Sequence, residues 1–208
     1  MKKIAIFDFD GTLANTFPIS SKILKEVVKD YGYGKISDDT VQKLRDMSPL
    51  QIILHFKFPI WKIPELLNRV REKVYDHVEY IKPFYGIKEM LDSLWKKNIK
   101  LGILTSNSKK IVDVFLKHKK FPKFEFIESE LNIFKKPRHL KKTISKYKFN
   151  KEDVIYIGDE IRDIEAAHFA GVDVAAVTWG YNKKHILQKN NPIFLADKPE
   201  ALLKFLLD

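Results

Sequence analysis

The sequence predicts an α/β fold, in which a parallel sheet with helices on both faces is interrupted by an inserted block of helices. Two observations carry this prediction. From residue 87 onward, short apolar runs alternate with amphipathic helical patterns, which is typical of a parallel sheet that is covered on both sides. Between residues 15 and 82 the pattern is helical throughout and contains no convincing strand. The inserted block therefore separates the first strand from the others.

The first elements are a short strand and three helices. The apolar run at residues 4–7 predicts a strand that is buried on both faces. In the helical block, apolar residues from Ile23 to Tyr31 form one stripe at helical spacing. Ser37 can cap a second helix, and Pro64 fits the first turn of a third.

The second half of the chain supplies the rest of the sheet. We expect residues 1–14 and 83–208 to form one core domain and residues 15–82 a second, helical domain inserted into it. The expected strands cover residues 100–105, 124–129, 154–158, 174–178 and 193–196; the expected helices cover residues 87–94, 108–119, 139–148 and 162–170, followed by a last helix that Asp197 caps and that holds Pro199 in its first turn.

Composition narrows the class of protein. The chain has 208 residues, 45% of them hydrophobic, which suits one core domain with a small insert. It has no cysteine, so thiolate catalysis and disulfides are excluded. No apolar run is long enough to cross a bilayer, and we expect a soluble, cytoplasmic protein. The net charge of +11 comes mainly from dispersed lysines, so nucleic acid is an unlikely partner, although this charge would favour a phosphorylated substrate.

The most informative feature is the end of the first strand, where Asp8 and Asp10 follow the apolar run. Residues two apart project to the same side of a strand, and buried carboxylates are rare without a partner. Such a pair repels unless a cation lies between the two groups or one of them is protonated. The first outcome predicts a Mg²⁺ site, and the second predicts a nucleophile beside an acid/base. A solvated turn capped by one of the acids is the simpler alternative.

Polar residues also follow the other predicted strands. Thr105, Ser106 and Asn107 end the second strand and could bind an anion at the start of a helix, although ordinary capping by Ser106 or Ser108 explains them as well. A later strand ends in three acids within six residues, which suit a helix N-terminus or a metal site. These acids are Asp159, Glu160 and Asp163, and the basic run Lys135-Lys136-Pro137-Arg138 precedes them.

In their order, these motifs resemble the haloacid dehalogenase superfamily of phosphohydrolases. The motifs are Asp8-Phe9-Asp10-Gly11-Thr12, then Thr105, then a lysine, then Gly158-Asp159 with Asp163. The helical insert is similar to the C1 cap of the phosphoglycolate phosphatase-like branch. The resemblance covers nearly the whole chain and implies a Rossmann-like core with an all-helical cap.

The resemblance also implies roles for the residues. Asp8 would be the nucleophile and Asp10 the acid/base. Mg²⁺ would be held by Asp8, the backbone carbonyl of Asp10 and Asp159. Phosphate would be bound by Thr105, Ser106, Asn107 and the catalytic lysine Lys136, which Asp163 would hold in place, while Arg45 lies where this branch often places a substrate-contacting loop.

Two departures from the family pattern leave questions open. The branch often carries Gly-Lys-Pro-x-Pro, whereas this chain has Phe134-Lys135-Lys136-Pro137-Arg138, so Lys135 is the alternative to Lys136. Asn15-Thr16 replaces an acidic residue often found after Gly-Thr-Leu, and this bears on substrate preference.

The predicted function is Mg²⁺-dependent hydrolysis of a small phosphorylated metabolite, phosphoglycolate-like or a sugar phosphate, by a monomer or homodimer. A phosphomutase-type phosphotransferase would use the same residues. A basic nucleic-acid-binding protein is the alternative from another class, and it would show strongly salt-dependent binding.

Overall fold

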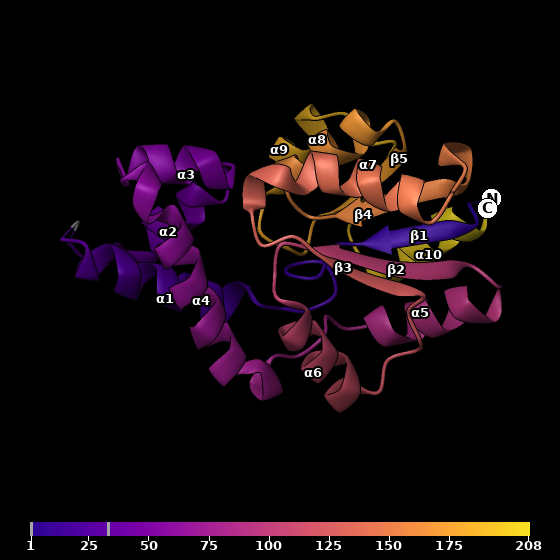
Figure 1. Cartoon of the computed structure of the whole chain (residues 1–208), viewed down its shortest axis with the longest axis horizontal. Helices are drawn as coiled ribbons and strands as arrows, with labels where there is room; N and C mark the ends of the chain where they lie inside the picture. The colour runs from indigo at the N-terminus through magenta and orange to yellow at the C-terminus, as the bar shows by residue number, and fades with distance from the viewer. Residues whose placement is uncertain (1, 33) are drawn as a thin grey trace.

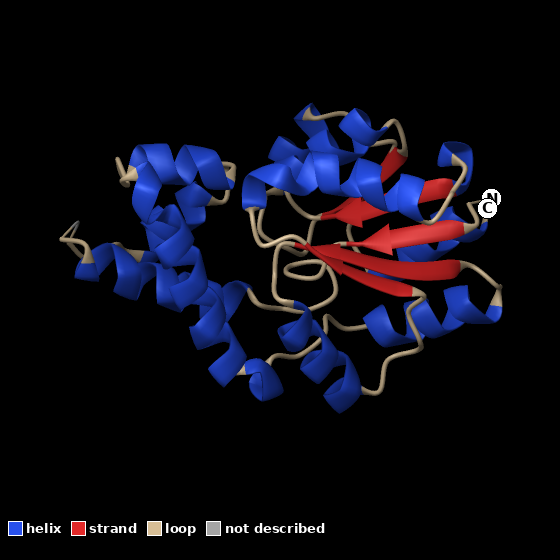
Figure 2. Ribbon diagram, in the orientation of Figure 1, coloured by secondary structure: helices blue, strands red, loops and turns tan. Residues whose placement is uncertain are grey.

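The computed structural model describes residues 2–32 and 34–208, and within them it shows one parallel sheet of six strands beside a group of helices (Figures 1 and 2). The strand order is β3-β2-β1-β4-β5-β6. This confirms the predicted α/β class. The strands are β1 (Ile4–Phe7), β2 (Lys100–Thr105), β3 (Phe126–Ser129), β4 (Val154–Gly158), β5 (Asp173–Val177) and β6 (Phe194–Ala196).

Helices cover both faces of the sheet. Side chains alternate along β1, so that Ala5 and Phe7 lie in one apolar cluster and Ile4 and Ile6 in another. The first cluster includes α5 (Ile87–Lys96), α6 (Lys109–Lys119) and α10 (Pro199–Leu207). The second includes α7 (Lys136–Lys146), α8 (Ile161–Ala170) and α9 (Lys184–Lys189). Burial on both faces explains why the sequence of β1 is an unbroken apolar run.

The helical block lies beyond the carboxyl ends of the strands, on the side to which the arrows point in Figure 1. The chain enters and leaves this block at neighbouring positions, because Ala14 pairs with Pro83 and the Asn15 N–H donates to the Lys82 carbonyl at 2.9 Å. Its helices are α1 (Phe17–Asp30), α2 (Asp38–Leu44), α3 (Pro49–His55) and α4 (Ile63–Asp76), with short 3-10 turns at Ile60–Lys62 and Val78–Tyr80.

Several details differ from the sequence predictions. The short helices α3 and α9 were not expected. The strand β3 begins two residues later than expected, and α7 begins at Lys136 instead of residue 139, because a 3-10 turn leads directly into it. The prediction that Asp197 caps the last helix is wrong: Lys198 is the N-cap residue, and the Asp197 carboxylate accepts from the Thr178 hydroxyl and from Lys184.

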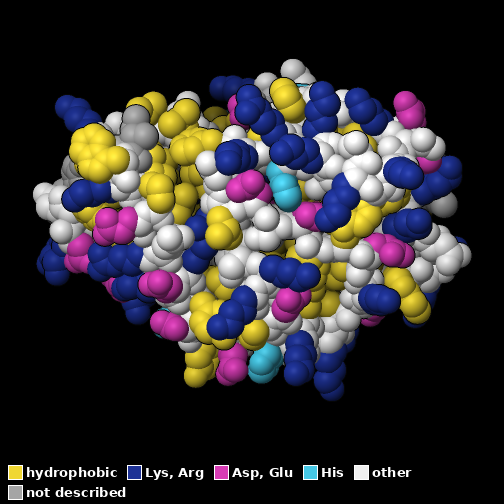
Figure 3. Space-filling model, in the orientation of Figure 1, with side chains coloured by type: hydrophobic (Ala, Val, Ile, Leu, Met, Phe, Trp, Pro, Cys, Tyr) yellow, Lys and Arg dark blue, Asp and Glu magenta, His cyan; other side chains and the backbone are white. Residues whose placement is uncertain are grey.

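The distribution of charged side chains on the surface agrees with the expectation that the lysines are dispersed. In Figure 3, lysine and arginine side chains are scattered over the face shown and mixed with acidic ones, while hydrophobic side chains gather over the helical block. None of the helices within residues 2–32 and 34–208 is both long and apolar enough to cross a membrane.

Candidate active site

The candidate site lies at the carboxyl edge of the sheet, around the end of β1. In the register of the sheet, Phe7 is paired with Ile103 of β2 and with Ile157 of β4. The Asp8 N–H then donates to the Ile157 carbonyl at 2.8 Å, which continues the ladder by one residue. The next positions along β2 and β4 lead to Thr105 and Asp159. The sheet therefore brings strand ends that are far apart in sequence to one edge. All strands run in the same direction, and the strand order reverses between β1 and β4.

Lys136 is buried between two carboxylates. Its Nζ lies 3.0 Å from Asp8 Oδ1 and also pairs with Asp163 Oδ1. Burial alone would lower the pKa of Lys136, but the adjacent Asp163 and Asp8 raise it above its usual value. Lys136 is therefore held as a cation beside Asp8. Lys135 is exposed, so the geometry favours Lys136 over Lys135 as the lysine of the site.

Asp163 is fixed at the start of α8. Its Oδ2 accepts hydrogen bonds from the backbone N–H groups of Asp159 and Glu160, at 3.1 and 2.9 Å, while Oδ1 pairs with Lys136. A carboxylate in the first turn also suits the helix dipole. This geometry supports the predicted role of Asp163, which is to position Lys136.

Asp8 keeps one carboxylate oxygen without a partner. Among the described residues, no group donates a hydrogen bond to its buried Oδ2. Burial raises the pKa of Asp8 to about 7, against the opposing effect of Lys136 and with a further increase from Asp163. An oxygen in this position is available to a metal ion or to a reacting phosphorus atom.

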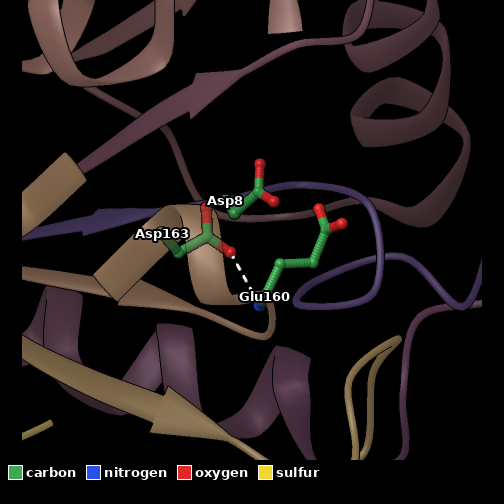
Figure 4. Close-up of side chains that lie close together, drawn as sticks. All are labelled: Asp8, Glu160 and Asp163. Carbon is green, nitrogen blue, oxygen red and sulfur yellow. Dashed lines mark hydrogen bonds between the residues drawn. The ribbon is translucent and has the colours of Figure 1, made fainter. Parts of the chain in front are cut away.

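Three carboxylates lie close enough together to share a metal ion. Oxygen atoms of Asp8, Glu160 and Asp163 lie within 4.8 Å of one another, and all three residues are buried. Figure 4 shows them converging from the end of β1 and the start of α8. Asp163 already pairs with Lys136 and two N–H groups, and Glu160 Oε2 pairs with Arg162, so Asp8, whose Oδ2 has no partner among the described residues, is the member best able to act as a ligand. Oxygen ligands of this kind suit Mg²⁺.

Asp159 faces a different set of partners. Its Oδ1 accepts from the Thr12 hydroxyl at 2.7 Å, and its Oδ2 accepts from the Tyr181 N–H at 2.7 Å. A Cβ atom at Gly11 or at Gly180 would lie 2.2 Å from Asp159 Oδ2, so only glycine fits at these two positions. Burial, followed by the nearby Glu160 and Asp163, raises the pKa of Asp159 well above its usual value. Whether Asp159 binds metal stays a prediction.

Asp10 and Asn107 form a hydrogen-bonded pair. The Asn107 side-chain amide donates to both Asp10 oxygens, at 3.2 and 3.0 Å. Burial raises the pKa of Asp10, although the hydrogen bonds from Asn107 and Thr16 oppose the increase. A raised pKa favours the protonated form of the carboxyl group, which is the direction that a general acid requires. The Asn107 N–H also donates to Thr105 Oγ1 at 2.9 Å, so this loop is well ordered around Asp10.

Two arginines were missed by the sequence interpretation. Arg162 donates from Nε to Glu160 Oε2 at 2.7 Å and from Nη1 to Ser106 Oγ at 3.1 Å. Arg71, on α4, donates from Nη2 to the backbone carbonyl of Ser106 at 3.2 Å and to that of Leu131. Arg162 had one available signal, because a cation in the first turn of a helix opposes the helix dipole. For Arg71 the sequence holds no such signal.

Arg45 ties the helical block to the loop after β5. Its Nε and Nη2 donate to the backbone carbonyls of Tyr181 and Gly180, both at 2.9 Å, and its Nη1 donates to Gln42. The Asn182 side chain in turn donates to the Arg45 carbonyl at 2.8 Å. The structure does not bring the Arg45 side chain into the cluster around Asp8. The predicted contact with substrate stays a prediction.

A cavity of about 280 Å³ separates the candidate site from the helical block. Asp10, Ser106, Asn107, Glu160 and Arg162 line it from the sheet edge. The opposite walls come from α1, α3 and α4. This cavity is the place where a substrate can reach the carboxylates.

Known proteins are similar to this chain in sequence. The family model described as haloacid dehalogenase-like hydrolase matches residues 5–177. A phosphoglycolate phosphatase of Synechococcus elongatus is 32% identical over 200 residues, which cover 96% of this chain and 94% of that protein. The pyrophosphatase PpaX of Bacillus cereus is 27% identical over 208 residues, which cover 98% and 95% of the two chains.

Solved structures share the fold. A predicted phosphatase from Clostridium acetobutylicum superposes with a TM-score of 0.86 at 19% identity, over 100% of this chain and 99% of that one. A haloacid dehalogenase-like hydrolase from Streptococcus pneumoniae gives 0.79 at 22% identity, over 99% and 98%. The family model and the relatives define the class of the protein as a hydrolase. The chain belongs to the haloacid dehalogenase-like hydrolase family, and this confirms the resemblance seen in its motifs.

Proposed function

We propose that this protein is a Mg²⁺-dependent phosphatase that hydrolyses a small phosphate monoester through an aspartyl-phosphate on Asp8. The observation that carries the proposal is the Asp8 carboxylate, which is paired with Lys136 through Oδ1 and left without a partner at Oδ2. The relatives named phosphoglycolate phosphatase and pyrophosphatase support a phosphorylated substrate.

The reaction divides into two transfers. Asp8 attacks the phosphorus atom, the bond from phosphorus to the ester oxygen breaks, and Asp10 gives a proton to the departing alcohol. Asp10, now ionised, takes a proton from a water molecule that attacks the aspartyl-phosphate and releases phosphate. The raised pKa of Asp10 suits the first step, because the acid must be protonated at its start.

Positive charge must balance the phosphate. Phosphoryl transfer depends mainly on positioning and electrostatic stabilisation. Lys136 lies 3.0 Å from Asp8 and can neutralise a phosphoryl oxygen there. The Thr105 hydroxyl and the N–H of Ser106 are the proposed donors to the other oxygens, with Asn107 beside them.

The residues present fit a divalent cation. The Asp8, Glu160 and Asp163 carboxylates share one small volume, and the buried Asp8 Oδ2 has no other partner. We propose the Asp8 carboxylate and the Asp10 backbone carbonyl as two ligands. For the third ligand, the motif indicates Asp159, whereas the clustering of carboxylates favours Glu160. When bound, Mg²⁺ would supply the positive charge that lets a carboxylate approach an anionic phosphate.

We also propose that residues 15–82 act as a cap domain on a core of residues 1–14 and 83–208. The two connections between the core and this cap lie side by side, because Ala14 pairs with Pro83, and we propose them as the hinge of the cap. A cap in this position would exclude water and select the leaving group. A monomeric or dimeric state and a cytoplasmic location stay predictions from the sequence.

A panel of phosphate monoesters and oligonucleotides, assayed with Mg²⁺ and with excess chelator, tests the proposal. We expect phosphate release from at least one monoester, lost on chelation and restored by Mg²⁺. Formation of an isomeric ester without free phosphate would instead indicate a phosphomutase. Salt-dependent oligonucleotide binding without any hydrolysis would indicate a nucleic-acid-binding protein.

A further inference from the structure

The walls of the cavity above the candidate site differ from its floor. The floor consists of polar groups of the sheet edge, among them Asp10, Asn107 and Arg162. The side chains that the helical block contributes are mostly aliphatic. They are Leu24 and Val27 from α1, Pro49, Ile52 and Ile53 from α3, and Leu66, Leu67, Val70 and Val74 from α4.

Two of these aliphatic side chains lie outside the apolar core. Leu24 and Ile52 are only partly buried, and neither belongs to the apolar clusters found among the described residues. Leaving such side chains facing a cavity forgoes the stabilisation that complete burial of an aliphatic side chain gives. An apolar ligand group in the cavity would recover part of this stabilisation.

Several polar groups of the cavity already make hydrogen bonds within the protein. Arg71 donates to two backbone carbonyls, and Arg162 is held by Glu160 and Ser106. The Tyr181 hydroxyl donates to Ser20 Oγ at 2.8 Å. A carboxylate or a row of hydroxyls on the leaving group would lose water and find few free partners here, which costs free energy.

We propose that the substrate is a phosphate monoester of a compact, uncharged and largely aliphatic alcohol. The phosphate would lie on the polar floor beside Asp8 and Asp10, and the alkyl group would lie against Leu24, Ile52 and their neighbours. This inference rests on the proposed phosphatase function and narrows its substrate. The cavity of about 280 Å³ is compact, which suits a small alkyl group.

A series of unbranched alkyl phosphates tests the proposal, because ethanol, propanol and butanol are leaving groups of nearly equal intrinsic reactivity. We expect kcat/KM for phosphate release, measured with Mg²⁺, to rise about fourfold per added methylene until the cavity is full. Propyl phosphate should also be hydrolysed faster than glycerol 3-phosphate, and ethyl phosphate should outperform 2-phosphoglycolate.

A matched pair of variants on α3 locates the effect. Ile52 lines the cavity, whereas Leu54 is 59% exposed and does not. In Ile52→Gln the dependence of kcat/KM on chain length should flatten, with at least about a tenfold lower ratio of butyl to ethyl phosphate. Leu54→Gln should keep the wild-type ratio. Circular dichroism and a thermal melt establish that both variants are folded.

The outcomes separate the two proposals. If alkyl phosphates are hydrolysed but the series is flat, or if 2-phosphoglycolate or glycerol 3-phosphate is preferred, the aliphatic substrate is wrong and the phosphatase stands. An unchanged ratio in folded Ile52→Gln also overturns it. If no monoester releases phosphate with Mg²⁺, the phosphatase proposal is wrong and this inference with it.

Discussion

The sheet edge and the helical block contribute to the same cavity in different ways. At the edge, Asp8, Lys136 and Asp163 are held by ion pairs and by hydrogen bonds to backbone groups. On the helical side, Leu24, Ile52 and Val70 make aliphatic walls. The edge therefore has the groups for chemistry, and the block has the surface that meets the leaving group. Substitutions at the edge should affect every substrate, whereas substitutions in the block should change the preference among substrates.

Among substitutions at the sheet edge, we expect the largest loss of activity at Asp8. Asp8→Asn removes the proposed nucleophile, so turnover of every phosphate ester should fall by a factor on the order of 10⁴ or more. The exposed Asp113 provides a matched control, and Asp113→Asn should retain wild-type rates. Initial rates of phosphate release measure both variants. Substantial hydrolysis by folded Asp8→Asn would remove Asp8 from the mechanism.

The same substitution should change the pH dependence of stability. Burial raises the pKa of Asp8 from 3.8 to about 7. The folded protein thus binds this proton more tightly than the unfolded chain, so the stabilisation is complete below about pH 4 and is lost as the pH rises toward about 7. Asp8→Asn has no such proton. Without Mg²⁺, wild type should therefore lose stability relative to Asp8→Asn over this window, by at most about 4 kcal/mol.

Urea unfolding of both proteins at about pH 5 and about pH 8 measures this difference. Adding Mg²⁺ at the higher pH should reduce it, because a cation favours the ionised carboxylate. A difference that is independent of pH would show that the Asp8 proton does not contribute to stability.

The next prediction compares two neighbouring lysines at the sheet edge, Lys136 and Lys135. Lys136 is buried against Asp8 and Asp163, whereas its neighbour Lys135 is exposed. Lys136→Ala should lower kcat by about 10²- to 10³-fold for all esters, since a charge that stabilises the phosphoryl oxygens is lost. Lys135→Ala should be close to wild type. Equal losses in the two variants would mean that neither lysine has a special position.

Sequence reasoning located the edge because each strand there ends in residues that a buried strand does not tolerate. Asp8, Asp10 and Asp159 are conspicuous for this reason, and parallel pairing brings them together. It named Glu160 only as one of three acids that suit a helix N-terminus or a metal site, and it missed Arg162. The backbone angles after β4 decide which of the neighbouring acidic side chains faces Asp8. The residue types alone do not predict these angles.

The helical block was predictable as helices but not as a cavity wall. Leu24 and Val27 belong to one apolar stripe of α1, yet Val27 joins the main core and Leu24 does not. The part of the stripe that packs on the core and the part that lines the cavity have the same apolar composition. The pattern alone therefore does not distinguish a core contact from a cavity contact. Arg71 is similar, because its partners Ser106 and Leu131 lie far away in sequence.

Measurements of Mg²⁺ binding would show whether Glu160 or Asp159 is a metal ligand. The Glu160 carboxylate lies in the cluster with Asp8 and pairs with Arg162 through Oε2, whereas both oxygens of Asp159 accept hydrogen bonds, from Thr12 and Tyr181. Glu160→Gln should weaken Mg²⁺ binding by about 10- to 100-fold, as measured by calorimetry, and Asp159→Asn should act mainly on thermal stability. The reverse result would assign the metal to Asp159, as the motif predicts.

The smallest effect is expected at Arg45, which joins the two regions. Its guanidinium donates to Gly180, Tyr181 and Gln42. Arg45→Ala should loosen the contact between the helical block and the edge, and should lower kcat/KM a few-fold to about tenfold, equally for aliphatic, sugar and carboxylate-bearing phosphate esters. Lys43→Ala, at an exposed position on α2, provides the control. A loss confined to one class of ester would instead show that Arg45 contacts the substrate, because a residue that only ties the block to the edge has no means to distinguish one leaving group from another.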